Sequence, residues 1–219
     1  FHNQEIVAKA GFEANIIENH DQPRGASLFI PEEDYGFYSL SALATIIFCE
    51  RGLPFLYQGQ EIGMSNRQWK YDEFNDLETI NQYQIALKAG MSKEQALEIA
   101  RHHSRDNART PMQWSSEENA GFSKGKPWMP VNENYKVVNV AEEEKEYGSI
   151  LNFYKRLIAF YKSEEYNEIL TYGDFRPMYE KEDHIFAYSR SYGCQKLVLI
   201  CNFSSKEKDI ELSEDYENV

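Results

Sequence analysis

The fold of this chain is decided by the stretch Ala14-Asn15-Ile16-Ile17-Glu18-Asn19-His20-Asp21-Gln22-Pro23-Arg24. An apolar run leads straight into ionisable residues, and Gly25 follows the last of them. An α/β barrel presents its active-site groups in this way, because its buried strands end at the C-terminal rim of the sheet. The stretch by itself leaves open an ordinary strand exit, in which His20 and Asp21 hydrogen-bond only to their own loop.

Length and charge limit the architecture and the partners of the chain. Its 219 residues can bury a substantial core, but a whole TIM barrel usually needs about 250, so we expect part of a barrel. The 23 basic and 36 acidic residues give a formal net charge of -13, which repels phosphate backbones and anionic membrane surfaces. We therefore expect no nucleic-acid partner and no membrane partner.

Cysteine usage and the start of the chain indicate its compartment. Cys49, Cys194 and Cys201 have no metal-ligand spacing, and Cys49 and Cys201 lie in apolar runs, as small buried hydrophobes do. We expect neither a metal nor a cofactor. No signal-peptide pattern opens the chain and no apolar run approaches the ~20 residues of a membrane span. These features predict a soluble, cytoplasmic protein.

The first part of the chain, up to about residue 66, alternates strand and helix. We expect strands over residues 14–18 and 54–57, both buried, with a helix between them that carries Leu40 and Ile47 on one face. This order is typical of a βαβ unit.

The stretch from about 67 to 148 is polar and irregular, which is typical of a binding loop. Two helices interrupt it. The first carries Leu77 in its apolar face and ends at Gly90, and the second begins at Ser92 with Gln95 completing a capping box. We therefore expect a long insert that contains two helices, rather than a further barrel strand.

The predicted secondary structure changes from alternating strand and helix to strands alone near the end of a helix that Ser149 is expected to cap. That helix aligns Tyr154 and Leu157 on one apolar face, and it follows an acidic run over residues 142–144 that we interpret as a solvated helix start. Short strands alone are expected afterwards, over residues 169–172, 175–179, 185–191, 196–203 and 210–212. We divide the chain into part of a barrel, residues 1–163, and part of an antiparallel all-β domain, residues 164–219.

Four blocks of the sequence resemble the C-terminal part of glycoside hydrolase family 13, the alpha-amylase family. Within it they are similar to the subgroup of oligo-1,6-glucosidase, dextran glucosidase and trehalose-6-phosphate hydrolase. The blocks are Asn19-His20-Asp21-Gln22-Pro23-Arg24, Gly52-Leu53-Pro54-Phe55-Leu56-Tyr57-Gln58-Gly59-Gln60-Glu61-Ile62-Gly63-Met64, Ser104-Arg105-Asp106-Asn107-Ala108-Arg109-Thr110-Pro111-Met112-Gln113-Trp114 and Asn119-Ala120-Gly121-Phe122.

The resemblance implies an α/β fold in which this chain forms the C-terminal portion of a (β/α)8 TIM barrel. The seventh strand would end at Asp21 and the eighth near Gly59, and part of the antiparallel all-β domain C would follow. It also implies a retaining α-glucosidase that hydrolyses terminal α-glucosidic bonds of short oligosaccharides. The family's nucleophilic Asp and acid/base Glu would lie upstream of Phe1, so we expect this chain alone to be inactive.

The same resemblance assigns roles to individual residues. Asp21 matches the third family carboxylate, a supporting catalytic residue that accepts hydrogen bonds from the sugar's 2- and 3-hydroxyls. His20 matches a donor to the same ring, and a metal-ligand role is weak because no second His or Cys lies at ligand spacing. Arg105 matches the arginine that holds the terminal glucose, whereas Arg109 is expected to be a structural ion-pair partner. For Arg24 two roles stay open, contact with the substrate on the leaving-group side and an ion pair with an acidic loop residue.

Several expectations concern the surroundings of this site. Glu61 is expected to brace loops, and Trp114 and Trp128 to pack the insert onto the barrel rather than to stack on sugar. The stretch 25–38 departs from the Ser-Arg-Phe-Gly pattern of the subgroup, so the preference among α-1,6 bonds, α-1,4 bonds and trehalose 6-phosphate stays open.

The partners expected are a small oligosaccharide and either the missing N-terminal barrel half or a second copy of the chain. The alternative to an enzyme is a non-catalytic family relative that acts as a binding or partner protein.

Overall fold

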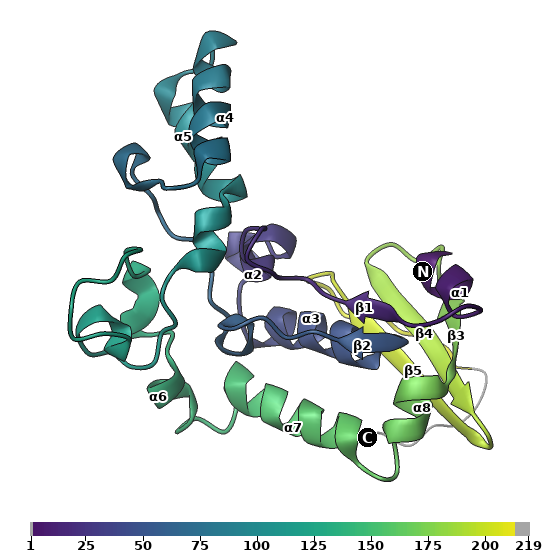
Figure 1. Cartoon of the computed structure of the whole chain (residues 1–219). Helices are drawn as coiled ribbons and strands as arrows, with labels where there is room; N and C mark the ends of the chain where they lie inside the picture. The colour runs from purple at the N-terminus through teal and green to yellow at the C-terminus, as the bar shows by residue number, and fades with distance from the viewer. Residues whose placement is uncertain (1, 213–219) are drawn as a thin grey trace.

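The computed structural model describes residues 2–212. A parallel strand pair with its helices forms one part, and an antiparallel sheet forms the other (Figure 1). The strands are β1 (Glu13–Asn15), β2 (Gly52–Pro54), β3 (Asp174–Met178), β4 (Ile185–Tyr192) and β5 (Gln195–Asn202). The α-helices are α1 (His2–Val7), α2 (Gly25–Phe29), α3 (Phe37–Cys49), α4 (Leu77–Lys88), α5 (Lys93–His103), α6 (Val140–Glu143), α7 (Ile150–Lys162) and α8 (Asn167–Tyr172). Short 3-10 helices in the connections are η1 (Glu32–Asp34), η2 (Gln60–Ile62), η3 (Tyr71–Glu73), η4 (Arg105–Arg109), η5 (Glu118–Gly121) and η6 (Glu133–Lys136).

Strands β1 and β2 pair in parallel, with α3 as the crossover between them. The βαβ prediction is confirmed, but both strands begin and end earlier than the sequence predicted. The predicted burial of the second strand is wrong around Phe55, which is 51% exposed, and Leu56, which is also exposed. The reason is that β1 and β2 pair only with each other among the described residues, so apolar side chains near their outer edges meet solvent.

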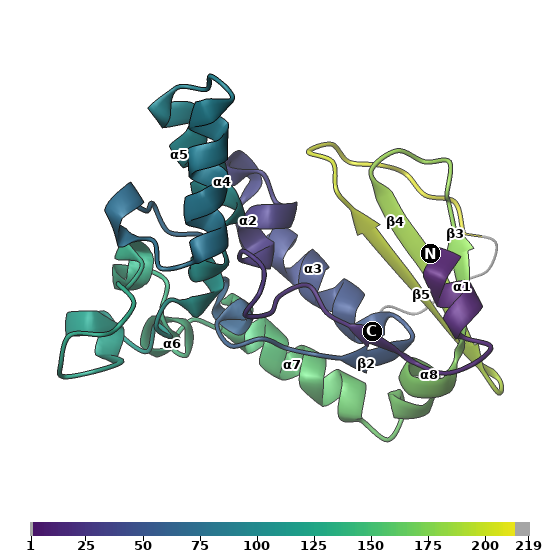
Figure 2. The same ribbon diagram turned by 45° about the horizontal axis from the view of Figure 1, so that its top comes forward.

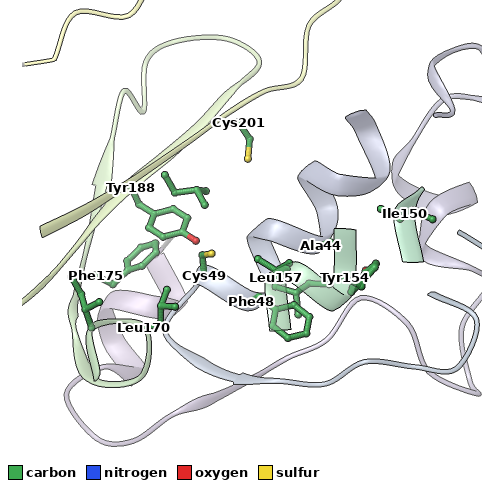
Figure 3. Packing of buried hydrophobic residues seen from close by; sticks show 13 residues of the cluster. Ala44, Phe48, Cys49, Ile150, Tyr154, Leu157, Leu170, Phe175, Tyr188 and Cys201 are labelled. Atoms are coloured by element: carbon green, nitrogen blue, oxygen red, sulfur yellow. The ribbon is translucent and has the colours of Figure 1, made fainter. Parts of the chain in front are cut away.

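A shared hydrophobic core joins the two parts of the molecule. Helix α3 lies beside α7, and both pack against the antiparallel sheet (Figures 1 and 2). Figure 3 shows Phe48 of α3 near Leu157 of α7, and the ring of Tyr188 beside Phe175, with 4.7 Å between the two ring centroids. Cys49 and Cys201 lie in this core as free thiols, as predicted. The predicted α7 is also confirmed, because Ser149 Oγ accepts the Asn152 N–H.

The antiparallel sheet has the order β3-β4-β5. Two of the five strands predicted for this part are wrong, because residues 169–172 belong to helix α8 and residues 210–212 form no strand. The first error has a clear physical cause: Ile169 and Leu170 are adjacent and both buried, which a helix end allows as readily as a strand does. Gly173 ends α8, where a Cβ atom would lie 2.4 Å from the Ile169 carbonyl oxygen.

Arg190 of β4 fastens the sheet to the helices, although it is fully buried. Its Nη1 donates to the Cys49 carbonyl at 2.7 Å, and its Nε and Nη2 donate to the Gly173 carbonyl at 3.2 and 3.0 Å. These carbonyls lie at the C-terminal ends of α3 and α8, where helix dipoles favour a cation. Arg190 therefore caps two helices at once from within the sheet.

The insert between β2 and α7 carries the hairpin of α4 and α5, which extends away from the rest of the molecule (Figures 1 and 2). The hairpin has a small core of its own, which contains Trp69, Phe74, Tyr83, Ala96, Ala100 and Met129. The capping box at Ser92 and the end of α4 before Gly90 are confirmed. The acidic run is not fully solvated, because Glu143 turns inward and accepts the Leu151 N–H at 3.0 Å.

Candidate active site

Asp21 lies on the loop that leaves β1, and basic groups surround its carboxylate. Its own N–H donates to Asn19 Oδ1 at 2.8 Å, which fixes the turn, while the side chain stays 54% exposed. Arg109 Nη2 lies 3.1 Å from Oδ1, Arg105 Nη1 lies 3.7 Å from the same oxygen, and His20 Nε2 lies 3.3 Å from Oδ2. The structure thus brings together Asp21, His20 and Arg105, as the sequence predicted, and adds Arg109.

Arg105 and Arg109 both sit on η4, at the base of the α4–α5 hairpin. Arg105 donates to Asp76 at the N-terminus of α4, through Nε at 3.2 Å and Nη2 at 2.5 Å. Arg109 donates through Nε to the His20 carbonyl at 3.0 Å, and its Nη1 lies 3.8 Å from Asp106 Oδ1. Arg109 therefore makes the shorter contact with Asp21, in addition to the structural ion pair expected for it.

Asp76 shows how strongly this arrangement favours ionised groups. Burial alone would raise the pKa of its carboxyl, but hydrogen bonds from Arg105 and Thr79 outweigh it and lower the pKa to about 2. The pKa of Arg105 is raised, chiefly by its hydrogen bonds to Asp76. Both groups are therefore charged at neutral pH.

Arg24 takes the second of the two roles that the sequence left open. Its side chain is fully buried, and Nη1 lies 3.3 Å from Glu18 Oε2, so Arg24 forms a buried ion pair and has no exposed surface with which to contact a substrate. The guanidinium also donates to the Gln58 carbonyl at 2.7 Å and the Asn107 carbonyl at 3.2 Å. Burial raises the pKa of Glu18, while Arg24 and the Gly25 N–H oppose that shift. Arg24 thus joins the exits of β1 and β2 to η4.

Three buried residues of this region were missed by the sequence reasoning. Asn107 uses its whole amide: Oδ1 accepts from Arg67 N and Trp69 Nε1, and Nδ2 donates to the Arg101 and Ser104 carbonyls. Asp106 Oδ2 accepts two backbone N–H groups from the start of the hairpin, and Asp76 anchors Arg105. Asp106 and Asn107 stand inside the block 104–114, but nothing in the sequence indicated that they are buried.

The surroundings bear out some expectations and leave others as predictions. Glu61 Oε2 accepts the Gly59 N–H at 2.7 Å, which fits the bracing role expected for it. Trp128 is 77% exposed and Trp114 is half exposed, so neither belongs to a core of the described residues, and their packing onto the barrel stays a prediction. Over residues 2–212, no group of His, Cys, Asp and Glu could hold a metal ion, and no helix is long and apolar enough to cross a membrane.

The chain matches one protein-family model and several curated proteins. The profile described as "Alpha amylase, catalytic domain" matches residues 2–173. The chain belongs to the alpha-amylase family. Curated relatives in this family include the oligo-1,6-glucosidase of Bacillus cereus, which is 41% identical over 97% of this chain and 38% of its own length. The glucan 1,6-alpha-glucosidase of Streptococcus pneumoniae is 37% identical over 94% of this chain and 38% of its own length.

Solved alpha-amylase-family structures agree with the chain in three dimensions. The trehalose-6-phosphate hydrolase of Bacillus licheniformis superposes with a TM-score of 0.89, at 39% identity, over 98% of this chain and 38% of that protein. The chain thus spans less than two fifths of the length of the relatives it matches, and its fold is a portion of theirs.

Proposed function

We propose that this chain is the C-terminal part of a retaining α-glucosidase that removes terminal glucose from short α-glucosides. The observation that carries the proposal is the exposed carboxylate of Asp21, framed by His20, Arg105 and Arg109 where the chain leaves β1. A charged group held this way by charged neighbours, but left open to solvent, suits a polyhydroxyl ligand better than a packing role.

The roles follow from the chemistry of glycoside cleavage. Retaining enzymes use two carboxyl groups about 5–5.5 Å apart, and the transition state resembles an oxocarbenium ion. By the family resemblance, both groups would lie upstream of this chain. Asp21 accepts hydrogen bonds from the sugar's hydroxyls, and its negative charge favours the cationic transition state. The same charge keeps a nearby glutamic acid protonated as the proton donor. His20 and Arg105 hold the terminal glucose, and Arg109 shares that task.

In this proposal β1 and β2 are the seventh and eighth strands of the barrel. Residues 1–163 form the end of the catalytic barrel, and residues 164–219 begin domain C. Ile16, Leu53 and Phe55 are exposed beside the open strand edges, and they would be covered by the N-terminal barrel half. Self-association of this chain is the other way to cover them.

Trehalose-6-phosphate hydrolysis is the second candidate, because the hydrolase of Bacillus licheniformis superposes so closely on the chain. The oligo-1,6-glucosidase relatives favour the first. The three free cysteines fit a reducing compartment, and we therefore also propose that the protein acts in the cytoplasm.

The test uses the complete polypeptide and four substrates: isomaltose, maltose, p-nitrophenyl α-glucoside and trehalose 6-phosphate. Asp21→Asn should lower kcat by at least ~10²-fold with a smaller effect on KM, the scale of one preorganised transition-state contact. Asp72→Asn removes another exposed carboxylate and serves as the control with unchanged kcat. Unchanged kcat in folded Asp21→Asn would remove Asp21 from the mechanism, and no turnover of any substrate by the wild type would favour a partner protein.

A further inference from the structure

Arg105 is held along one edge of its guanidinium. Nε and Nη2 both donate to the Asp76 carboxylate, at 3.2 and 2.5 Å, and the remaining Nη1 faces Asp21 Oδ1 at 3.7 Å. A two-point contact between a planar guanidinium and a carboxylate fixes the orientation of both groups. The anchored edge therefore determines where Nη1 points.

Asp76 is itself firmly placed. Its side chain is only 3% exposed, and it caps α4 by accepting the Glu78 N–H and the Thr79 hydroxyl. Its backbone N–H donates to Asp106 Oδ2 at 2.9 Å, so the start of the hairpin is tied to the residue that follows Arg105. The hairpin and η4 therefore hold Asp76 from both sides.

We infer that Asp76 is a positioning residue, which acts on the substrate through Arg105 and aims Arg105 Nη1 at the sugar site beside Asp21. This inference rests on the proposed function of that site. It gives the α4–α5 hairpin a task in catalysis, although the hairpin extends away from the strands (Figure 1). Glu78 Oε2 lies 3.6 Å from Arg105 Nη2, but Glu78 is 61% exposed and makes only this one contact with Arg105, so it cannot replace Asp76.

Asp76→Asn separates positioning from folding. Asparagine is as good an N-cap as aspartate, so α4 keeps its cap, but the charge-assisted pair with Arg105 is lost. In the complete enzyme kcat/KM should fall about 10²-fold, the effect of a small misplacement of a contact group, while Tm changes little. Thr79→Val is the matched control, because it removes the contacts of the Thr79 hydroxyl with Asp76 and with Ser104 Oγ but leaves both hydrogen bonds between Arg105 and Asp76 in place. It should lower Tm and leave kcat/KM within about twofold of the wild type.

A double variant tests whether Asp76 acts through Arg105. Asp76→Asn combined with Arg105→Ala should be no slower than Arg105→Ala alone, because the anchor has nothing left to hold. Losses that multiply in the double variant would overturn the inference. A loss of kcat/KM in Thr79→Val as large as in Asp76→Asn would do the same, because the effect would then come from hairpin stability.

A measurement without turnover distinguishes this inference from the proposed function. Phenylglyoxal modifies free guanidinium groups, and the Arg105 peptide can be followed by mass spectrometry. Asp76→Asn should accelerate modification of Arg105 at least fivefold, whereas Thr79→Val should not. Equal rates in wild type and Asp76→Asn would overturn the anchoring by Asp76 even if the enzyme is active. Absence of any α-glucoside hydrolysis by the wild type would instead overturn the proposed function.

Discussion

Replacing Asn107 with alanine should destabilise the base of the insert more than any exposed substitution nearby. Asn107 is fully buried, and its amide makes the four hydrogen bonds that two donors and two lone pairs allow, to Arg67 N, Trp69 Nε1 and the Arg101 and Ser104 carbonyls. Each buried bond contributes about 1 kcal/mol net, so the loss amounts to about 4 kcal/mol. That loss lowers Tm by about 8–16 °C in a domain of about 150–250 residues. The complete polypeptide is longer, so its Tm should fall by less, because its unfolding entropy is larger.

The assay combines thermal unfolding of the complete polypeptide with amide hydrogen exchange. Exchange at Arg67 should accelerate, because its N–H bonds to Asn107 Oδ1. Asn75→Ala is the control, since its exposed amide makes only two weaker contacts, at 3.2 Å to the Glu73 carbonyl and at 3.5 Å to Met129 Sδ. We expect it to cost less than about 1 kcal/mol. A Tm for Asn107→Ala no lower than that of the control would refute the account of Asn107 as the residue that holds the base of the insert together.

The remaining predictions concern the site, a buried carboxyl and the chain by itself. Arg109→Ala should lower kcat/KM as strongly as Arg105→Ala, because Arg109 makes the shorter contact with Asp21. A kinetic loss confined to Arg105→Ala would instead restore the roles inferred from the sequence, with Arg105 on the sugar and Arg109 in a structural ion pair. Burial raises the pKa of Glu143 from 4.5 to about 7, so the native state loses stability as pH rises through that window. Glu143→Gln should therefore raise Tm at pH 8 and leave it nearly unchanged at pH 4, and thermal scans that show the opposite order would contradict the shift. Residues 1–219 alone should hydrolyse neither isomaltose nor p-nitrophenyl α-glucoside, and activity should return when the upstream strands are supplied. Hydrolysis by the pure chain, abolished by Asp21→Ala, would contradict the supporting role assigned to Asp21.

Local signals in the sequence predicted local structure well. The capping box at Ser92, the cap at Ser149 and the βαβ order each depend on residues close together in the chain, and all three are confirmed. The approach of His20 and Arg105 to Asp21 was also expected, but it came from the family resemblance rather than from residue spacing.

Features that depend on contacts between distant segments were missed. Ile169 and Leu170 form a run too short to distinguish a strand from a helix end, and only packing against the sheet decides it. The ion pair of Arg24 needed the knowledge that Glu18 is buried beside it. Asp76 and Arg105 are 29 positions apart, so their pairing follows from how the hairpin folds back.

Because Arg190 caps both α3 and α8, it limits which parts of this chain can be exchanged with the matching parts of a relative. A sheet taken from a relative would be tolerated here only with an arginine at that position, because otherwise the ends of α3 and α8 would each lose a buried donor. The part of the chain that can be exchanged as a unit, here called the module, therefore includes the sheet and the C-terminal ends of α3 and α8. A chimera joined just after α7 divides this module, because the end of α3 comes from one parent and the sheet from the other. It should be stable when the parent of the sheet has an arginine at this position, and aggregation-prone when that parent has none.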